Sequence, residues 1–362
     1  PIAGVGGRLG FKGSDGAYGI RAVMEGVELV SPTRARRFAQ ALRKEAERAG
    51  VEVEVLAPPG LMGVESLGSL GLRVVTEPCV PPKIWPTTAH DTIRCARALA
   101  RKVELLAFVG GDGTARDIYT AIGSSLPVVG VPAGVKMYSA VFAVNPEAAA
   151  SVVMAALQGR AVLEERPVID VDEDEFRRGR LVLRTYGYLL VPVVEGVVVE
   201  ASKSPSRGEG LEEIAEFFVR EIVEECTLYI LGPGSTIARI AERMGVKKTL
   251  LGVDAVHNGR LVGVDLDEKG ILELIQRYRR AKVVVTPIGG QGFILGRGNQ
   301  QISPQVVKNV GKDNLIVVAT QDKLKGLKTL RVDTGDEEVD KMLRGYIRVL
   351  VGYGKWRVVK VE

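Results

Sequence analysis

The sequence has 362 residues, of which 46% are hydrophobic and 26% charged, enough for two domains with ample hydrophobic core. No apolar run is long enough to span a membrane and no secretory signal is visible, so we expect a cytoplasmic protein without a membrane partner. The net charge is +5, and basic residues alternate with acids along the chain. This indicates solvated helix faces, excludes a nucleic-acid-binding stripe, and suits polyanionic small molecules.

The three cysteines, Cys79, Cys95 and Cys226, are scattered along the chain. They form no metal-binding or disulfide pattern, which fits a reducing cytoplasm. Asn and Gln are scarce beside Arg, Glu and Val, a composition that suggests a thermophile.

Residues 1–19 are dense in glycine and include Gly4, Gly6 and Gly7. They predict either a flexible loop or a loop that binds the phosphates of a nucleotide, and the sequence leaves both open. A glycine loop normally follows a strand, and none precedes Pro1. We therefore expect that residues upstream are missing.

The next segments predict a helix and two strands. Ser31-Pro32 provides a cap and a first-turn proline, apolar residues recur on one helical face, and Gly50 ends the helix. Valines at positions 51, 53 and 55 alternate with acids, which indicates a strand. A short strand follows at residues 73–75.

Thr88-Ala89-His90-Asp91 resembles a capping box before a helix over residues 92–102. One interpretation of Asp91 is this cap. The other is that Asp91 and Thr92 bind substrate opposite Asp112, because their loop follows a strand of the same predicted sheet.

The chain is organised around residues 104–121. Leu105–Val109 is a continuous apolar run, typical of a strand buried on both faces. Gly110, Gly111 and Gly113 then surround Asp112, and Thr114 is the expected N-cap of the next helix. A strand that ends in a glycine turn before a helix is suited to binding anions through backbone N–H groups.

Asp112 is the unusual residue of this turn, because a carboxylate repels phosphate unless it has a chemical task. The functional interpretation is therefore proton transfer. The structural alternative is an Asx-turn in which Asp112 caps Thr114 or Ala115.

Residues 127–131 predict another buried strand, followed by Gly134 and Lys136. Ligands of open parallel sheets bind beyond the carboxyl ends of the strands, where both residues would lie. Lys136 would neutralise phosphate there, or it is a surface lysine.

Alternating strands and helices predict an α/β, doubly wound, Rossmann-like domain over residues 1–145. An alanine-rich helix over 146–157 would lead out of it. The β-branched segments after residue 162 predict a β-rich α+β domain over residues 146–362, with the active site in the cleft between the domains.

Two further signals lie in the second predicted domain. A buried strand over 226–231 ends in Gly232-Pro233-Gly234-Ser235-Thr236 and opens a helix, which makes a second candidate anion site. This junction lacks the lysine of a P-loop. Asn258-Gly259 between apolar segments predicts a β-hairpin.

A late glycine loop follows the predicted strand 281–287 and spans residues 289–301. It combines glycines with amide and guanidinium donors, a composition that suits a nucleotide or a sugar hydroxyl. The candidate substrate-binding residues are Gly289, Gly290, Gln291, Arg297 and Asn299.

Four segments carry a family resemblance. Gly110–Thr114 after a buried strand resembles the signature shared by NAD kinases and diacylglycerol-type lipid kinases, and Pro1–Gly7 is similar to the opening glycine loop of that superfamily. Gly130–Met137 and Thr286–Asn299 resemble an archaeal and bacterial ATP-NAD kinase-like branch that includes acetoin-catabolism proteins.

The resemblance implies an ATP-dependent phosphotransferase. Asp112 would be the general base toward an acceptor hydroxyl, the ribose 2′-OH if the acceptor is NAD. Backbone N–H groups of Gly110, Gly111, Gly113 and Thr114 would hold the phosphates of ATP, with Mg²⁺ offsetting their charge. The expected partners are small-molecule nucleotides, and we expect a homo-oligomer. The donor, ATP or polyphosphate, stays open.

One departure concerns the acceptor. NAD kinases resemble one another in an Asn-Glu pair early in the second domain, and residues 181–186 of this chain read Leu-Val-Leu-Arg-Thr-Tyr instead. The loop Pro132–Met137 also differs from the NAD kinase form. The alternatives are a kinase of another small hydroxyl compound and a non-catalytic nucleotide-binding regulator.

Overall fold

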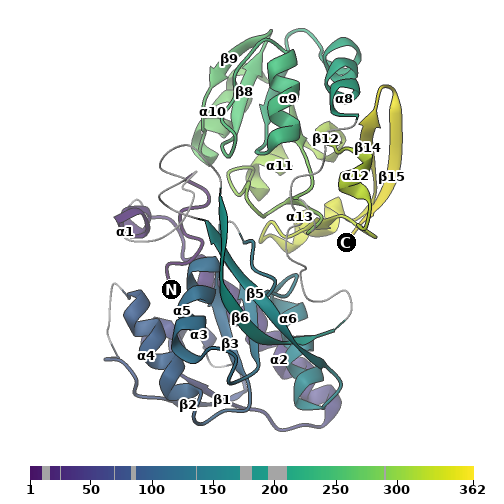
Figure 1. Cartoon of the computed structure of the whole chain (residues 1–362). Helices are drawn as coiled ribbons and strands as arrows, with labels where there is room; N and C mark the ends of the chain where they lie inside the picture. The colour runs from purple at the N-terminus through teal and green to yellow at the C-terminus, as the bar shows by residue number, and fades with distance from the viewer. Residues whose placement is uncertain are drawn as a thin grey trace. The chain divides into compact units, whose positions relative to one another are not determined.

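The computed structural model describes residues 1–9, 17–24, 26–68, 70–82, 87–135, 137–171, 182–194, 210–288 and 291–362. The chain divides into two compact units (Figure 1). The first comprises Pro1–Val5 and Gly13–Ala201, and the second comprises Gly6–Lys12 and Ser202–Glu362. Both units mix helices and strands, so the predicted two-domain α/β fold is confirmed.

The elements of the first unit alternate between helices and strands. They are α1 (Ala17–Met24), α2 (Val30–Ala49), β1 (Glu54–Ala57), a 3-10 turn (Gly60–Met62), α3 (Val64–Leu67), β2 (Arg73–Thr76), α4 (Ala89–Leu99), β3 (Leu106–Gly110), α5 (Asp112–Ile122), β4 (Val128–Pro132), α6 (Pro146–Leu157), β5 (Val162–Val171) and β6 (Leu183–Val193).

Helices cover both faces of the parallel pair β3–β4, as the doubly wound prediction requires. Successive strand residues point to opposite faces. Phe108 and Val128 therefore pack with buried residues of α4 and α5, whereas Val129 and Val131 pack with α2 and α6. The prediction that β2 shares this sheet is wrong for the described residues, because β2 pairs with β1 in a separate two-stranded sheet.

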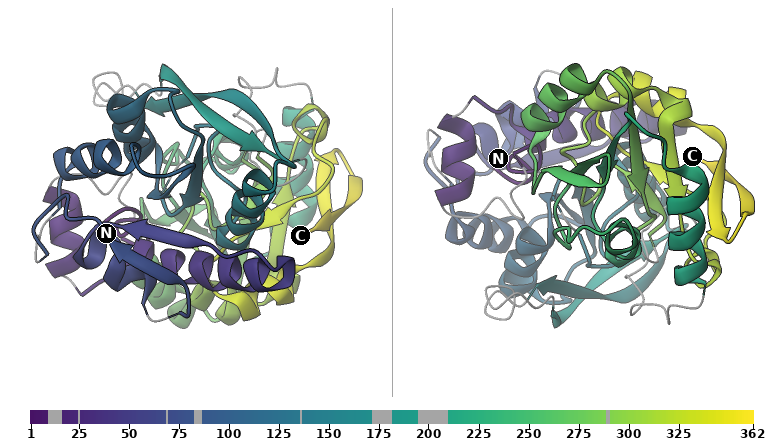
Figure 2. Two further views of the ribbon diagram at one scale, coloured as in Figure 1. Left: turned by 90° about the horizontal axis from the view of Figure 1, so that it is seen from below. Right: turned by 90° about the horizontal axis from the view of Figure 1, so that it is seen from above.

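The antiparallel ribbon β5–β6 also belongs to the first unit, and it is drawn in teal in Figures 1 and 2. Val168, Leu189 and Val191 are buried in the same cluster as α4 and α5, and Gly187 leaves room for the ring of Tyr119 on α5. The predicted boundary after residue 145 therefore differs from the division at Ala201 and Ser202, because packing assigns α6 and the ribbon to the first unit.

Cys79 and Cys95 form a disulfide, with their Cα atoms 5.1 Å apart. The interpretation that the cysteines form no disulfide pattern is therefore wrong for this pair. The chain after β2 runs alongside α4, as the ion pair between Glu77 and Lys102 also shows, and spacing alone does not reveal that return. Cys226 is a free, exposed thiol.

The second unit is built on a seven-stranded sheet. Its elements are α8 (Leu211–Phe217), a π-helical turn (Phe218–Ile222), β7 (Leu228–Leu231), α9 (Ser235–Arg243), β8 (Asp254–His257), β9 (Arg260–Gly263), α10 (Glu268–Tyr278), β10 (Ala281–Val285), β11 (Phe293–Leu295), α11 (Pro304–Val310), a 3-10 turn (Lys312–Asn314), β12 (Leu315–Val318), α12 (Gln321–Leu324), β13 (Arg331–Val332), α13 (Glu337–Leu343), β14 (Gly345–Gly352) and β15 (Lys355–Val361).

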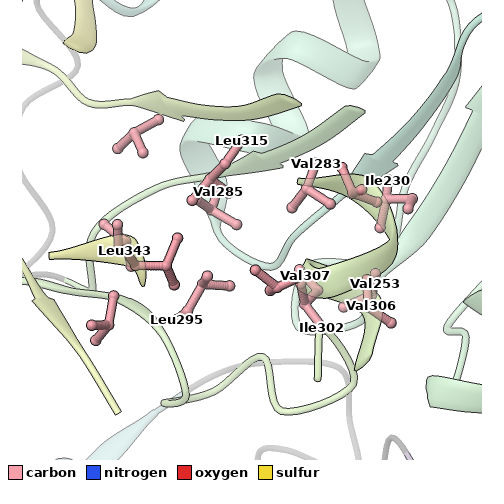
Figure 3. Close-up of a cluster of buried hydrophobic side chains, with 14 of the residues drawn as sticks. Ile230, Val253, Val283, Val285, Leu295, Ile302, Val306, Val307, Leu315 and Leu343 are labelled. Carbon is pink, nitrogen blue, oxygen red and sulfur yellow. The ribbon is translucent and has the colours of Figure 1, made fainter. Parts of the chain in front are cut away.

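The strand order is β15-β14-β12-β10-β7-β8-β9, and the middle strands β14, β12, β10 and β7 are parallel. Successive residues of each strand again point to opposite faces of the sheet, and each face is covered by helices. Ile230 and Val283 pack with α10 and α11 (Figure 3), whereas Tyr229 and Val284 pack with α8 and α9. The sheet is thus a mixed α/β layer with antiparallel edges.

The hairpin predicted around Asn258-Gly259 is confirmed as β8–β9. Both turn residues have positive φ, 46° and 70°, as a two-residue hairpin turn requires. Among the described residues, no helix is both long and apolar enough to cross a membrane.

Candidate active site

Helix α5 begins at Asp112, with Gly111 as its N-cap. The backbone N–H of Ala115 already donates to the carbonyl of Gly111 at 3.0 Å. The prediction that Thr114 is the N-cap is therefore wrong, because the chain turns into the helix three residues earlier, at Gly111. Asp112 consequently lies in the first turn, where the helix dipole favours a negative charge.

Two backbone amides hold the carboxylate of Asp112. The N–H of Tyr138 donates to Oδ2 at 2.6 Å, and the N–H of Ser139 donates to Oδ1 at 3.0 Å. These amides come from the segment after β4, so the Asx-turn alternative does not describe what holds this side chain. Each carboxylate oxygen accepts one of these backbone bonds and keeps further lone-pair capacity for another donor.

Burial raises the pKa of Asp112 to about 7, because the side chain is only 4% exposed and ionisation in the interior loses solvation. Hydrogen bonds from Ser139 and Tyr138 favour the ionised form and oppose this effect. A carboxyl group that titrates near neutral pH is suited to accept a proton during catalysis.

Charged neighbours extend the site along α5 and the β5–β6 ribbon. Arg116 lies one helical turn after Asp112 and forms an ion pair with Asp170 at 3.3 Å. Its guanidinium also lies 5.3 Å from the ring centre of Tyr186. The negative charge of Asp170 contributes to the raised pKa of Asp112.

Burial, together with the charges of Asp112 and Asp170, raises the pKa of Tyr138 to about 12. Its phenol is therefore neutral at physiological pH. Sequence reasoning missed Tyr138, Ser139, Asp170 and Arg116. Only Arg116 had a local signal, because residues four apart lie on one helix face.

The glycine loops after β3 and β4 meet beside Asp112. The amides of Ala133 and Gly134 donate to the carbonyl of Gly110 at 2.9 and 3.1 Å. A Cβ atom on Gly111 would lie 2.8 Å from the Cα atom of Gly134. Gly134 is therefore brought to Asp112, as predicted for residues at adjacent strand ends.

The N-terminal glycines divide between the two units. Gly4 packs against the carbonyl oxygen of Ala133, and the Ser31 hydroxyl donates to the carbonyl of Ala3 at 2.9 Å. Gly6 and Gly7 belong to the second unit. Gly4 of the predicted phosphate loop is thus placed beside the loop that follows β4.

Gly113 and Thr114 lie in the first turn of α5, where backbone N–H groups lack partners within the helix. The Thr114 side chain packs closely on Gly110, which has no room for a Cβ atom. The described residues contain no group of three His, Cys, Asp or Glu that would hold a metal. Mg²⁺ in kinases is usually held by one or two carboxylates and the phosphates of the substrate, which this donor set permits.

Asp91 forms the capping box of α4. Its Oδ2 accepts from the backbone N–H of Thr88 at 2.9 Å and from the Thr88 hydroxyl at 2.8 Å. The cap interpretation is confirmed and accounts for this carboxylate. A contact of Asp91 or Thr92 with substrate stays a prediction. The shared sheet that motivated this prediction is not present, because β2 pairs with β1.

The late glycine loop is held together by its own polar side chains. Asn299 Nδ2 donates to the carbonyl of Ile294 at 2.9 Å, and its Oδ1 accepts from the N–H of Gly296 at 3.1 Å. Arg297 is buried, lies 3.7 Å from Asp333 in an ion pair and 4.2 Å from the ring centre of Phe293.

Gln291 is also buried, and its carbonyl accepts from Arg331 at 3.4 Å. The Asn299 side chain and Arg297 thus also have structural contacts within the second unit. Contact of this loop with substrate, and the cleft that it would share with Asp112, stay predictions. Lys136, Gly289 and Gly290 lie outside the described residues.

The fold and this site together define a two-domain α/β phosphotransferase. Residues 30–161 match the ATP-NAD kinase N-terminal domain, and residues 224–361 match the ATP-NAD kinase C-terminal domain. The chain belongs to the ATP-NAD kinase family, as its motifs predicted. Neither a curated protein nor a solved structure matches the chain. The β5–β6 ribbon lies between the two matched segments.

Proposed function

We propose that this protein is an ATP-dependent kinase in which Asp112 is the general base that activates an acceptor hydroxyl group. The observation that carries the proposal is the buried Asp112 carboxyl group, whose pKa of about 7 suits proton transfer at neutral pH. The acceptor we propose is the ribose 2′-OH of NAD, on the strength of the family.

The residues around Asp112 have distinct tasks in this mechanism. The amides of Tyr138 and Ser139 orient the carboxylate, so that a free lone pair accepts the proton of the acceptor hydroxyl. The first-turn N–H groups of Gly113 and Thr114 bind phosphate oxygens of ATP. Mg²⁺, when bound with ATP, neutralises charge on the phosphates.

Arg116 and Asp170 tune the base and do not transfer a proton. Burial is the main cause of the raised pKa of Asp112, Asp170 adds a smaller contribution, and Arg116 pairs with Asp170 at 3.3 Å. The neutral phenol of Tyr138 adds no negative charge near the phosphates. This arrangement supports a base that is ionised for about half of the time near pH 7.

The acceptor is the finer part of the proposal. Residues 183–186 of the segment that departs from the NAD kinase pattern lie in β6, where the guanidinium of Arg184 lies 5.4 Å from the ring centre of Tyr186. An aromatic and cationic pair at this place favours a second candidate, a kinase of another small hydroxyl compound. Cytoplasmic location and homo-oligomer formation stay predictions.

The test is a turnover assay with the purified chain, Mg²⁺ and ATP or polyphosphate as donor. NAD, NADH and a panel of polyols serve as acceptors, and both released ADP and NADP are measured. We expect NADP in step with ADP. If ADP is released with a polyol and not with NAD or NADH, the polyol is the acceptor and NAD is not. Binding of ATP without ADP release from any acceptor would overturn the kinase and favour the regulator.

A further inference from the structure

Three neighbouring strands of the second unit end beside one another with polar residues. The parallel strands β7, β10 and β12 are adjacent in the sheet. Gly234 follows β7, Thr286 follows β10, and Lys323 follows β12 on the short helix α12. Ligands of α/β sheets bind at the carboxyl ends of such strands.

Contacts join these three residues into one cluster. The side-chain ammonium of Lys323 donates to the hydroxyl oxygen of Thr286 at 3.0 Å. A Cβ atom on Gly234 would lie 3.2 Å from Cγ2 of Thr286. Thr286 therefore links the glycine junction that opens α9 to a lysine, which is the residue that the local sequence of this junction lacks.

The side chain of Lys323 is half-buried, and its ammonium group donates to a neutral hydroxyl. Burial lowers its pKa to about 8. Across the described part of the chain, no carboxylate lies within 4.0 Å of this ammonium group, and its hydrogen bond goes to Thr286. A cation that loses part of its solvation without gaining an opposite charge is unfavourable, so an anion beside Lys323 would stabilise this cluster.

The start of α9 supplies further donors at the same place. Its N-cap is Gly234, which provides no side-chain cap, and the first bond within the helix runs from the N–H of Ala238 to the carbonyl of Gly234 at 3.0 Å. The amides of residues 235–237 precede that bond. Thr236 is 5% exposed, and its hydroxyl makes no hydrogen bond within the described residues.

We propose that the second unit binds a phosphate group at the junction of Gly234, Thr286 and Lys323. The amides at the start of α9 and the Thr236 hydroxyl donate to the oxygens of the phosphate, and Lys323 supplies the opposite charge. The ligand class is a phosphate or diphosphate, either free or within a nucleotide. The site is independent of Asp112 and holds whether or not the protein transfers phosphate to NAD.

The experiment measures binding by calorimetry in buffer free of Mg²⁺ and phosphate. Inorganic phosphate, pyrophosphate, ATP and NAD are titrated separately, which identifies the source of the phosphate group. We expect at least one of these ligands to bind the wild type, and we expect Lys323→Met to weaken the binding of that ligand about tenfold or more. Lys325→Met is the matched control, because Lys325 is an exposed lysine on the same segment that pairs with Asp322. It should bind as the wild type does.

Two further measurements guard against misfolding and against confusion with the kinase site. Thr286→Val should also weaken binding, and the ligand should raise the melting temperature of the wild type but not of Lys323→Met. Asp112→Asn should keep this binding even where it abolishes turnover. Absence of binding by every ligand, or equal affinity in wild type and Lys323→Met, overturns the proposal.

Discussion

Gly111 and Gly134 pack backbone against backbone, so that a Cβ atom on Gly134 would lie 2.6 Å from the Cα atom of Gly111. This approach holds the loop after β4 against the start of α5, and that loop leads into the amides that bind Asp112. The Cα atoms of Gly111 and Gly134 belong to the backbone, so neither can move aside as the end of a flexible side chain would.

We therefore expect Gly134→Ala to destabilise the first unit by about 1–3 kcal/mol and to slow phosphotransfer. Urea unfolding and turnover measure the two effects. Gly270→Ala is the control, because Gly270 lies in α10 and a Cβ atom there meets only side-chain atoms closely, Leu266 Cδ2 at 3.1 Å and Asp267 Oδ1 at 3.2 Å. It should be neutral or stabilising. Equal effects of the two substitutions would contradict the role of the glycine contact.

Asp112→Asn should lower the turnover number by about 10²–10⁴ while the protein stays folded and still binds ATP. The reason is that proton abstraction needs the carboxylate, whereas main-chain N–H groups hold the phosphates. Asp117→Asn, on the same helix, is the matched control and should stay active. Wild-type turnover in Asp112→Asn would remove Asp112 from the mechanism.

The pH profile of kcat/KM should rise through about pH 7, because the base must lose its proton before it accepts another. Asp170→Asn should move this rise to lower pH. The substitution removes a negative charge that raises the pKa of Asp112 and leaves Arg116 without its partner at 3.3 Å. Glu164→Gln, on the same strand, is the control. An unchanged profile in Asp170→Asn would show that Asp170 does not act on the base.

Local signals in the sequence predicted the parts of the fold that local chemistry determines. The apolar strand before Gly110, the capping box of Thr88 and Asp91, and the Asn258-Gly259 turn each involve residues within a few positions of one another. Their geometry depends on backbone preferences and short-range hydrogen bonds. The same signals also located Asp112 as the centre of the candidate site.

The missed features depend on contacts between distant segments. Asp112 and Ser139 are 27 residues apart, and Asp170 reaches the site on a ribbon that the sequence assigned to the other domain. The disulfide joins Cys79 and Cys95 because the chain returns along α4. Sequence spacing does not predict these contacts, because they depend on how helices and strands that are distant in the sequence pack together.

Asn299→Ala should destabilise the second unit by about 1–3 kcal/mol, because it leaves buried backbone groups of Ile294 and Gly296 without their partner. Urea unfolding measures this loss. Asn309→Ala removes an exposed amide bond to Gln305 and serves as the control. Stability equal to the wild type would contradict the structural role. A changed KM for ATP or NAD in the folded variant would support the predicted substrate contact as well.

The contribution of Asp112 to the stability of the folded protein should fall as pH rises from about 4 to 7. Its folded pKa of about 7 lies above the value of 3.8 expected for an exposed carboxyl group. Between these values the folded state holds a proton that the unfolded state has lost, so each rise in pH favours unfolding.

The difference corresponds to a contribution on the order of 4 kcal/mol, present in full below pH 4 and lost by pH 7. Asp112→Asn carries no titrating group at this position. As pH rises from 5 to 8, the free energy of unfolding of Asp112→Asn should therefore increase relative to that of the wild type. Urea unfolding at several pH values from 5 to 8 measures the gap between the two proteins. Asp117→Asn should instead follow the wild type. If the curves of wild type and Asp112→Asn run parallel from pH 5 to 8, burial does not raise the pKa of Asp112, and the carboxyl group is already ionised well below neutral pH.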